Sequence, residues 1–354
     1  MRASRLETAV DVQTLEVKVH NGEVKDDRQE TDDAQPRRAL SAPTAGCVGV
    51  QVTGIDGPDD EGPNGWAEWS PFLEYPDEEA AIWLAAAIEF AYGNLPTLHR
   101  DRISVNATLP AVSPDHVEKV LGRFGAFRTV KIKVAEKGQD PNEDLQRVWA
   151  VRAAYPDARI RLDANGGYSV EQSITMAGAM LENGVPLDYL EQPVATIAEM
   201  ADLRLRFSKS GIAVKIAADE SVRKVSDPLA VVQAEAADIL VLKAAPLGGV
   251  SRAVEIAREA GLPVVVSSAL ESSVGLSMGA HLAAALPELE FDSGLATASL
   301  LAGDVTREPL LPVDGFIDVR RVEIDQQKLD TFEAEDHRID WWIDRLDRAF
   351  KHLN

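Results

Sequence analysis

The chain has very little cysteine: Cys47 is the only one among its 354 residues, so no internal disulfide can form. It also has no run of 18 apolar residues, and no apolar signal core lies near its start. These absences lead us to expect a protein of a reducing cytoplasm, with no membrane span and no secretory signal.

Positive charge is scarce as well. Lys and Arg total 36 against 58 Asp and Glu, which gives a formal net charge of −22. Such a field repels phosphate backbones and anionic lipid, so we expect neither a nucleic-acid partner nor a membrane partner. An anionic substrate needs a local reversal of sign, and a bound cation supplies one.

From about residue 102, short apolar runs alternate with amphipathic helical runs, which predicts βαβ units and a parallel sheet. Capping boxes at Asp140 and Ser169 mark the starts of two of the helices that separate these apolar runs. The expected strands are 103–109, 129–134, 160–165, 186–192, 214–220, 238–244 and 262–268, with 291–297 as a candidate eighth. Eight units over about 200 residues favour an α/β fold of the (β/α)8-barrel type. The alternative, a doubly wound open sheet, lacks a GxGxxG or P-loop after its first strand.

The segments on either side of the expected barrel do not show its regular alternation of strands and helices. We expect a helix over residues 77–92 and partly disordered or irregular chain over 1–45, where polar residues of mixed charge show no period. The two flanks are expected to pack together as one α+β capping domain. The predicted divisions are an N-terminal cap over 1–98, a catalytic barrel over 99–300 and a C-terminal return over 301–354.

Polar side chains end successive strands of the expected barrel. In chain order they are Lys131 and Lys133, Asp163 and Asn165, Glu191, Asp219 and Glu220, Lys243, and Ser267 and Ser268. From Lys133 to Ser267 the steps between strands are 24 to 30 residues, one βα unit each. The side chains are therefore predicted to be ring neighbours at the C-terminal mouth, where barrel active sites lie.

Three of these residues are acids, Asp163, Glu191 and Asp219. Three bare carboxylates at one mouth would repel each other in a partly dry site. A hard divalent cation removes that conflict, and oxygen ligands with open positions point to Mg²⁺, with Mn²⁺ as a substitute.

Lysines flank the acids on both sides of the ring. Strand alternation puts Lys131 and Lys133 on one face, where neighbouring cations lower the pKa of a candidate general base. With Lys243 opposite, this arrangement suits proton abstraction next to a carboxylate, with the metal holding the enediolate. We therefore expect a small-molecule carboxylate substrate.

Several motifs resemble the enolase superfamily on its muconate-lactonizing-enzyme side. They are KIK (131–133), DANGGYS (163–169), EQP (191–193), ADES (218–221) and LVLKAAPLGG (240–249). Further segments are similar to actinobacterial o-succinylbenzoate synthases, namely WSPFLEY (69–75), SVNATLPA (104–111), VVSSALESSVGL (265–276) and PLLPVDGFIDVRRVE (309–323). The resemblance covers about residues 64 to 352 and implies a modified TIM barrel with a cap. Pairing a Lys base with Mg²⁺ is a known property of that superfamily.

The resemblance implies a carbon–oxygen lyase of menaquinone biosynthesis, with Mg²⁺ on Asp163, Glu191 and Asp219. Lys133 would take the α-proton of a cyclohexadiene carboxylate and return it to the leaving hydroxyl, a syn loss of water. Lys243 would stabilise the flat anionic intermediate by charge and cation–π contact.

Supporting roles are also implied. Lys131 would lower the pKa of the base and contact the carboxylate, while Asn165 and Glu220 would support the metal site. The remaining residues would act on the succinyl tail (Ser267 and Ser268) and in a loop that closes the mouth (Phe72 and Leu73).

Two alternatives stay open at this point. The first is a racemase of N-acylamino acids or a dipeptide epimerase, which uses both lysines in the same superfamily; the second is a catalytically silent binding barrel. Residues 1–55 do not show the short strand and the Arg-, Gly- and Thr-rich loop usual in such synthases, so 36–46 is either a degenerate version or a replacement. The sequence leaves monomer and homo-oligomer both open.

Overall fold

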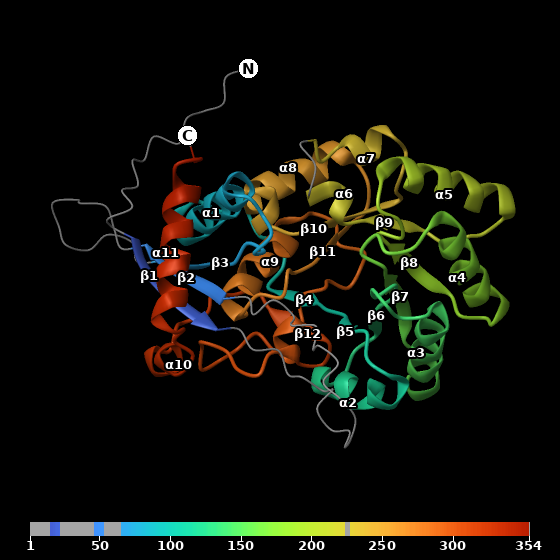
Figure 1. The fold of residues 1–354 in the computed structure, drawn as a ribbon, viewed down its shortest axis with the longest axis horizontal. Coiled ribbons are helices and arrows are strands. Elements are labelled where there is room, and N and C mark those ends of the chain that lie inside the picture. The colour runs from blue at the N-terminus through green and yellow to red at the C-terminus, as the bar shows by residue number, and fades with distance from the viewer. Residues whose placement is uncertain (1–14, 22–45, 53–64, 224–226, 354) are drawn as a thin grey trace.

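The computed structural model describes residues 15–21, 46–52, 65–223 and 227–353, and a curled parallel sheet lies at its centre (Figure 1). Seven strands pair in chain order, each parallel to the next. They are β5 (Ala107–Leu109), β6 (Thr129–Lys133), β7 (Arg159–Asp163), β8 (Leu187–Glu191), β9 (Ile216–Ala218), β10 (Ile239–Leu242) and β11 (Val264–Val266). The predicted strand order is confirmed.

The sheet closes into a barrel through a short segment rather than a full strand. Ser293 forms a parallel bridge with Val105 on one side, and Gly294 forms one with Ser267 on the other. The candidate eighth strand at 291–297 is thus not formed as a strand; only Ser293 and Gly294 take its place between the first and last strands.

The prediction of one continuous strand over 103–109 is wrong, because the structure divides this segment into two short strands. Its first part, β4 (Arg102–Ser104), pairs antiparallel with β12 (Phe316–Asp318), outside the barrel sheet. The N–H groups of Val105 and Asn106 then bond the carbonyls of Gly315 and Ser293, both at 2.9 Å. Because two different segments take over the backbone partners at this point, one continuous strand cannot form.

Helices cover the outside of the barrel (Figure 1). They are α2 (Val117–Leu121), α3 (Pro141–Ala154), α4 (Val170–Glu182), α5 (Ile197–Ser210), α6 (Glu220–Arg223), α7 (Ala230–Gln233), α8 (Val250–Ala260) and α9 (Ser273–Ala285). The capping boxes predicted at Asp140 and Ser169 are both present. Within the ranges that the structure covers, no helix combines the length and apolarity of a membrane span.

The two flanks meet on one side of the barrel (Figure 1). The N-terminal flank contributes an antiparallel sheet of β1 (Leu15–Asn21), β2 (Gly46–Val52) and β3 (Gly65–Trp69), followed by α1 (Asp77–Tyr92). The C-terminal flank contributes α10 (Gln326–Thr331) and α11 (Asp336–Phe350). α11 lies against α1 and β1, and Trp342 packs edge-on against Trp69 at 5.6 Å.

β1 lies within residues 1–45, where no strand was predicted. Its sequence, LEVKVHN, alternates apolar and polar residues, which is the period of a half-buried strand, but the pattern is short and its partner β2 begins 25 residues after it ends. Residues 1–14 and 22–45, including most of the segment suggested as a covering loop, lie outside the described residues.

Two carboxylates of the cap accept hydrogen bonds at the N-termini of barrel helices. Glu89 of α1 accepts from the N–H groups of Val250 (2.6 Å) and Ser251 (3.1 Å) at the start of α8. Glu68 of β3 accepts from the N–H of Ser272 (3.0 Å) at the start of α9. Negative charge at a helix N-terminus is favourable, so these contacts fix the cap relative to the mouth.

Replacing Glu89 by alanine should lower the free energy of unfolding by about 1–2 kcal/mol, because α8 has no side-chain cap of its own at Gly249. Urea denaturation measures the change, with the exposed Glu290→Ala as the matched control. Equal stabilities for the two variants would contradict a capping role for Glu89.

Candidate active site

The predicted ring of acids and lysines comes together at the C-terminal ends of the barrel strands. Lys131 and Lys133 extend from the same face of β6, as alternation requires. Lys131 Nζ lies 2.8 Å from Glu191 Oε1 and 3.0 Å from Asp163 Oδ2. Lys133 Nζ lies 2.5 Å from the same Asp163 oxygen. The lysines and carboxylates therefore form one connected charge network.

Lys243 directly follows β10, which lies two strands beyond β8, the strand that ends at Glu191. Its Nζ lies 2.6 Å from Asp219 Oδ2, and its side chain is buried. The acids thus have an ammonium group at each end of their arc: Lys131 and Lys133 at the Asp163 end, and Lys243 at the Asp219 end.

The three acids are almost completely buried, yet their electrostatics differ. Burial alone would raise the pKa of Asp163, but the charges of Lys131 and Lys133 hold it well below its usual range. The pKa of Asp219 is lowered against the effect of burial by Lys243 and Arg223. These two carboxylates therefore stay charged.

Glu191 is the exception among the acids. Burial, followed by the charge of Asp163, raises the pKa of its carboxyl to about 7. Its Oε2 is buried and accepts no hydrogen bond from the described residues. A buried carboxylate oxygen that accepts no hydrogen bond suits a hard cation.

The donor set at the mouth fits a hard divalent ion in chemistry. All three acids offer oxygen, and they end neighbouring strands β7 and β8 or directly follow β9. In the portion of the chain that is described, no three acidic, histidine or cysteine side chains stand ready-made as a metal cluster. Ammonium groups lie against the carboxylates instead, with Lys131 bridging Asp163 and Glu191.

The two supporting residues predicted beside the acids also lie here. Asn165 Oδ1 accepts from Lys133 Nζ at 2.7 Å, and its Nδ2 donates to Glu220 Oε1 at 3.2 Å. Asn165 has φ 46°, a left-handed conformation that asparagine tolerates better than most residues. The turn after β7 therefore aims its amide across the mouth.

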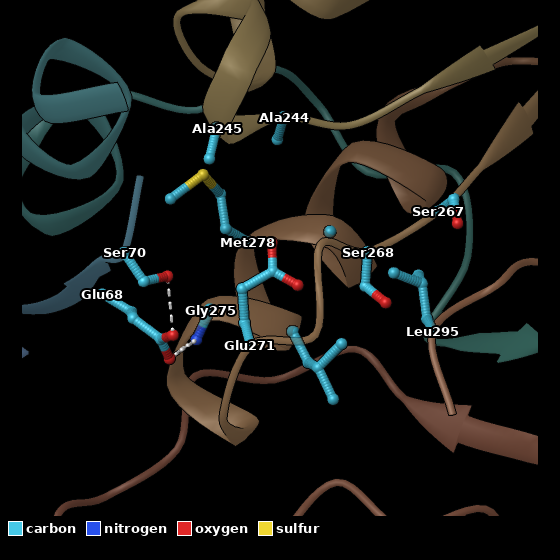
Figure 2. Close-up of a pocket in the computed structure, with 12 residues that line it drawn as sticks. Glu68, Ser70, Ala244, Ala245, Ser267, Ser268, Glu271, Gly275, Met278 and Leu295 are labelled. Atoms are coloured by element: carbon cyan, nitrogen blue, oxygen red, sulfur yellow. Dashed lines mark hydrogen bonds between the residues drawn. The ribbon is translucent and has the colours of Figure 1, made fainter. Parts of the chain in front are cut away.

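The two predicted serines lie on the cap side of the mouth. Ser267 and Ser268 line a pocket together with Glu68 and Glu271 (Figure 2). Ser268 Oγ donates to the carbonyl of Gly294 at 2.9 Å. The pocket also includes Ala244 and Ala245, which directly follow Lys243 in the chain, so it lies near the Lys243 end of the arc.

The cap loop after β3 meets the barrel through Phe72. Its ring lies 5.6 Å from the guanidinium carbon of Arg223 and packs edge-on against Tyr75 at 5.3 Å. Leu73 is half-buried against the apolar core.

Arg223 and Glu271 were not selected from the sequence. Arg223 follows Asp219 by four residues on a short helix and pairs with it at 3.1 Å, a signal that the i,i+4 spacing carries. Glu271 lies within a segment that carried the resemblance. Burial, and after it the charge of Glu68, raises the pKa of Glu271 to about 7. No sequence pattern predicts that Glu68 and Glu271 lie close together, because Glu68 belongs to the cap and Glu271 to the barrel.

The chain belongs to the enolase superfamily. The "Enolase C-terminal domain-like" family model matches residues 115–323, and the "Enolase N-terminal domain-like" model matches 60–91. Among solved structures, muconate lactonizing enzyme from Pseudomonas putida superposes with a TM-score of 0.70 at 21% identity, covering 90% of this chain and 99% of that one. The 2-chloromuconate cycloisomerase from Rhodococcus opacus 1CP gives 0.71 at 21% identity, covering 90% and 98%. At these identities the structures establish the fold.

Relatives with higher sequence identity show to which family within the superfamily the chain belongs. The o-succinylbenzoate synthases of Mycobacterium tuberculosis H37Rv and Mycobacterium marinum M are each 51% identical over 293 residues, or 83% of this chain and 87% of the relative. The chain is thus a member of the o-succinylbenzoate synthase family, and the resemblance seen in the motifs is confirmed.

Proposed function

We propose that this chain dehydrates 2-succinyl-6-hydroxy-2,4-cyclohexadiene-1-carboxylate to 2-succinylbenzoate, a step of menaquinone biosynthesis. The observation that carries the proposal is the pair of lysine groups at opposite ends of three buried acids, in a chain 51% identical to enzymes of that name. Loss of water from this ring makes it aromatic, so the chemistry needs one proton acceptor, one proton donor and stabilised negative charge.

Asp163, Glu191 and Asp219 would hold Mg²⁺, or Mn²⁺ in its place. When bound, the ion supplies positive charge beside the substrate carboxylate, where negative charge develops as the α-proton leaves. The unsatisfied Oε2 of buried Glu191 supports this assignment, since no described group donates a hydrogen bond to it.

Exposure separates the two lysines of β6. The Lys131 side chain is 8% exposed, and Asp163 and Glu191 raise its pKa well above the usual value against the effect of burial. Lys131 is therefore a fixed cation. The Lys133 side chain is 32% exposed and faces the open mouth, so it is the lysine within reach of a substrate.

Lys133 Nζ would take the proton from ring carbon 1, and the electron pair of that C–H bond would move into the carboxylate. The same Nζ would then give this proton to the hydroxyl on carbon 6, which leaves as water while the pair returns to the ring. The amine ends as it began, and one water is released for each ring made aromatic. One group serving both transfers requires that proton and hydroxyl leave from the same face.

Lys243 would hold the planar anion from the other side by charge, with no proton to move. Ser267 and Ser268, in the pocket beside Lys243, would bind the succinyl tail (Figure 2). Phe72 and Leu73 of the cap loop would close the mouth. Asn165 and Glu220 would keep the acids oriented.

Removing divalent cations should abolish dehydration. Loss of the diene absorbance is expected with Mg²⁺, should stop in EDTA, and should return with excess Mg²⁺ or Mn²⁺, because the ion would supply the positive charge that stabilises the negative charge developing on the substrate carboxylate. The control is thermal unfolding in EDTA, which should show a folded protein. Turnover that persists in EDTA would contradict the assignment of the three acids.

A further inference from the structure

Arg223, at the end of α6, joins the cap to the strand end that carries Asp219. Its Nε lies 3.1 Å from Asp219 Oδ1, and its Nη2 lies 2.6 Å from Glu220 Oε1. Its Nη1 donates to the hydroxyl of Tyr75, and its guanidinium faces the ring of Phe72. The side chain is 8% exposed, so these contacts occupy nearly all of a planar group that is largely out of water.

The Asp219 carboxylate is divided between two cations. Oδ2 faces Lys243 at 2.6 Å, and Oδ1 faces Arg223 at 3.1 Å. The plane of the carboxylate is therefore set partly from the barrel interior and partly by a residue whose own position depends on the cap.

The cap loop, residues 70–76, is held from its other side by a second buried arginine. Arg345 of α11 donates to the carbonyls of Phe72 (2.7 Å) and Tyr75 (3.0 Å). The rings of Phe72 and Tyr75 also pack edge-on against Trp83 of α1. The loop backbone thus belongs to the cap, while its side chains reach Arg223.

We propose that Arg223 is a positioning residue that couples the seating of the cap loop to the orientation of Asp219, and through it to cation binding. The identity of Asp219 as a metal ligand rests on the proposed function. When the loop is seated, Tyr75 and Phe72 hold the guanidinium fork flat against Asp219. When it lifts, the fork loses its contacts with Tyr75 and Phe72 and is held only by Asp219 and Glu220. Its hold on Oδ1 is then less well oriented, so loop seating and ion binding favour each other reciprocally.

The geometry requires arginine, because lysine has the charge but not a rigid fork that meets Asp219, Glu220 and Tyr75 together. Arg223→Lys should therefore weaken Mn²⁺ binding about 10–100-fold, the usual cost of losing a group that orients a metal ligand. It should also speed amide hydrogen exchange in the peptide covering 70–76. The control is Arg206→Lys, at a half-exposed arginine of α5 paired with Glu171 and Asp202, which should change neither quantity.

Tyr75→Phe tests the same link from the cap, keeping the ring contacts and removing the hydroxyl. It should also speed exchange in the loop and weaken Mn²⁺ binding, and the double variant should bind Mn²⁺ no more weakly than Arg223→Lys alone, since both changes break one link. Mn²⁺ binding and exchange are measured without substrate, so their outcome is independent of whether the parent dehydrates the diene.

Parent-like Mn²⁺ affinity in Arg223→Lys, or parent-like exchange in its cap loop, would overturn the coupling. If thermal unfolding shows that Arg223→Lys does not fold, Tyr75→Phe decides alone, and parent-like Mn²⁺ affinity in that variant overturns the proposal. Weaker binding together with faster loop exchange supports it.

Discussion

Lys133→Ala should lower kcat for dehydration about 10⁴-fold, the upper end for general acid–base catalysis, because one amine makes both proton transfers. The effect is expected mainly in kcat, since Lys131, Lys243 and the acids remain to bind substrate and ion. The fold should survive, as Asp163 keeps Lys131 at 3.0 Å. Steady-state kinetics with the diene substrate measures the loss.

Two comparisons make the Lys133 result specific. Lys209→Ala removes an exposed lysine of α5 and should leave kcat unchanged. A small primary amine added to Lys133→Ala should restore part of the rate by entering the space left at the mouth. More than a hundredth of the parent kcat in Lys133→Ala without added amine would show that another group takes the proton.

Lys243 should tolerate a change that Lys133 does not. Lys243→Ala should cost about 10³-fold in kcat, because it removes the charge that stabilises the anion and also a partner of Asp219. Lys243→Arg keeps a cation at the same place and should stay within about tenfold of the parent, a cost of about 1.4 kcal/mol. Parallel kinetics of the two variants measure the difference.

This pair of variants also separates dehydration from racemisation. A racemase moves a proton through each lysine in turn, and arginine cannot give up its proton near neutral pH. If Lys243→Arg is as inactive as Lys243→Ala toward the diene, then Lys243 carries a proton and its purely electrostatic role is wrong.

The ring of acids and lysines could be predicted because each member is marked by local pattern. A strand end followed by a turn is recognisable within ten residues, and the βα spacing then orders Lys133, Asp163, Glu191, Asp219 and Lys243 around the mouth. The structure brings these five residues together. Their catalytic and metal-binding roles stay proposals, as do the domain boundaries at 98 and 300.

The features that were missed depend on partners far along the chain. Arg223 reaches Tyr75 across 148 residues, and Glu68 caps Ser272 across 204. The division of the strand over 103–109 arises because Gly315 and Ser293 supply its backbone partners. Local propensity and periodicity contain no information about such pairings, which follow from the closure of the barrel and the return of the C-terminal flank to the cap.

Dehydration at this mouth is tested most directly by a side-by-side assay of one preparation of the purified protein, with Mg²⁺, on the cyclohexadiene carboxylate and on an N-succinyl amino acid. We expect rapid loss of diene absorbance with one 2-succinylbenzoate formed for each diene consumed, and racemisation that is slower or undetectable. Racemisation without loss of the diene would contradict it and assign the chain to proton exchange at an acylated amino acid. Inactivity toward both compounds would contradict catalysis at this mouth altogether.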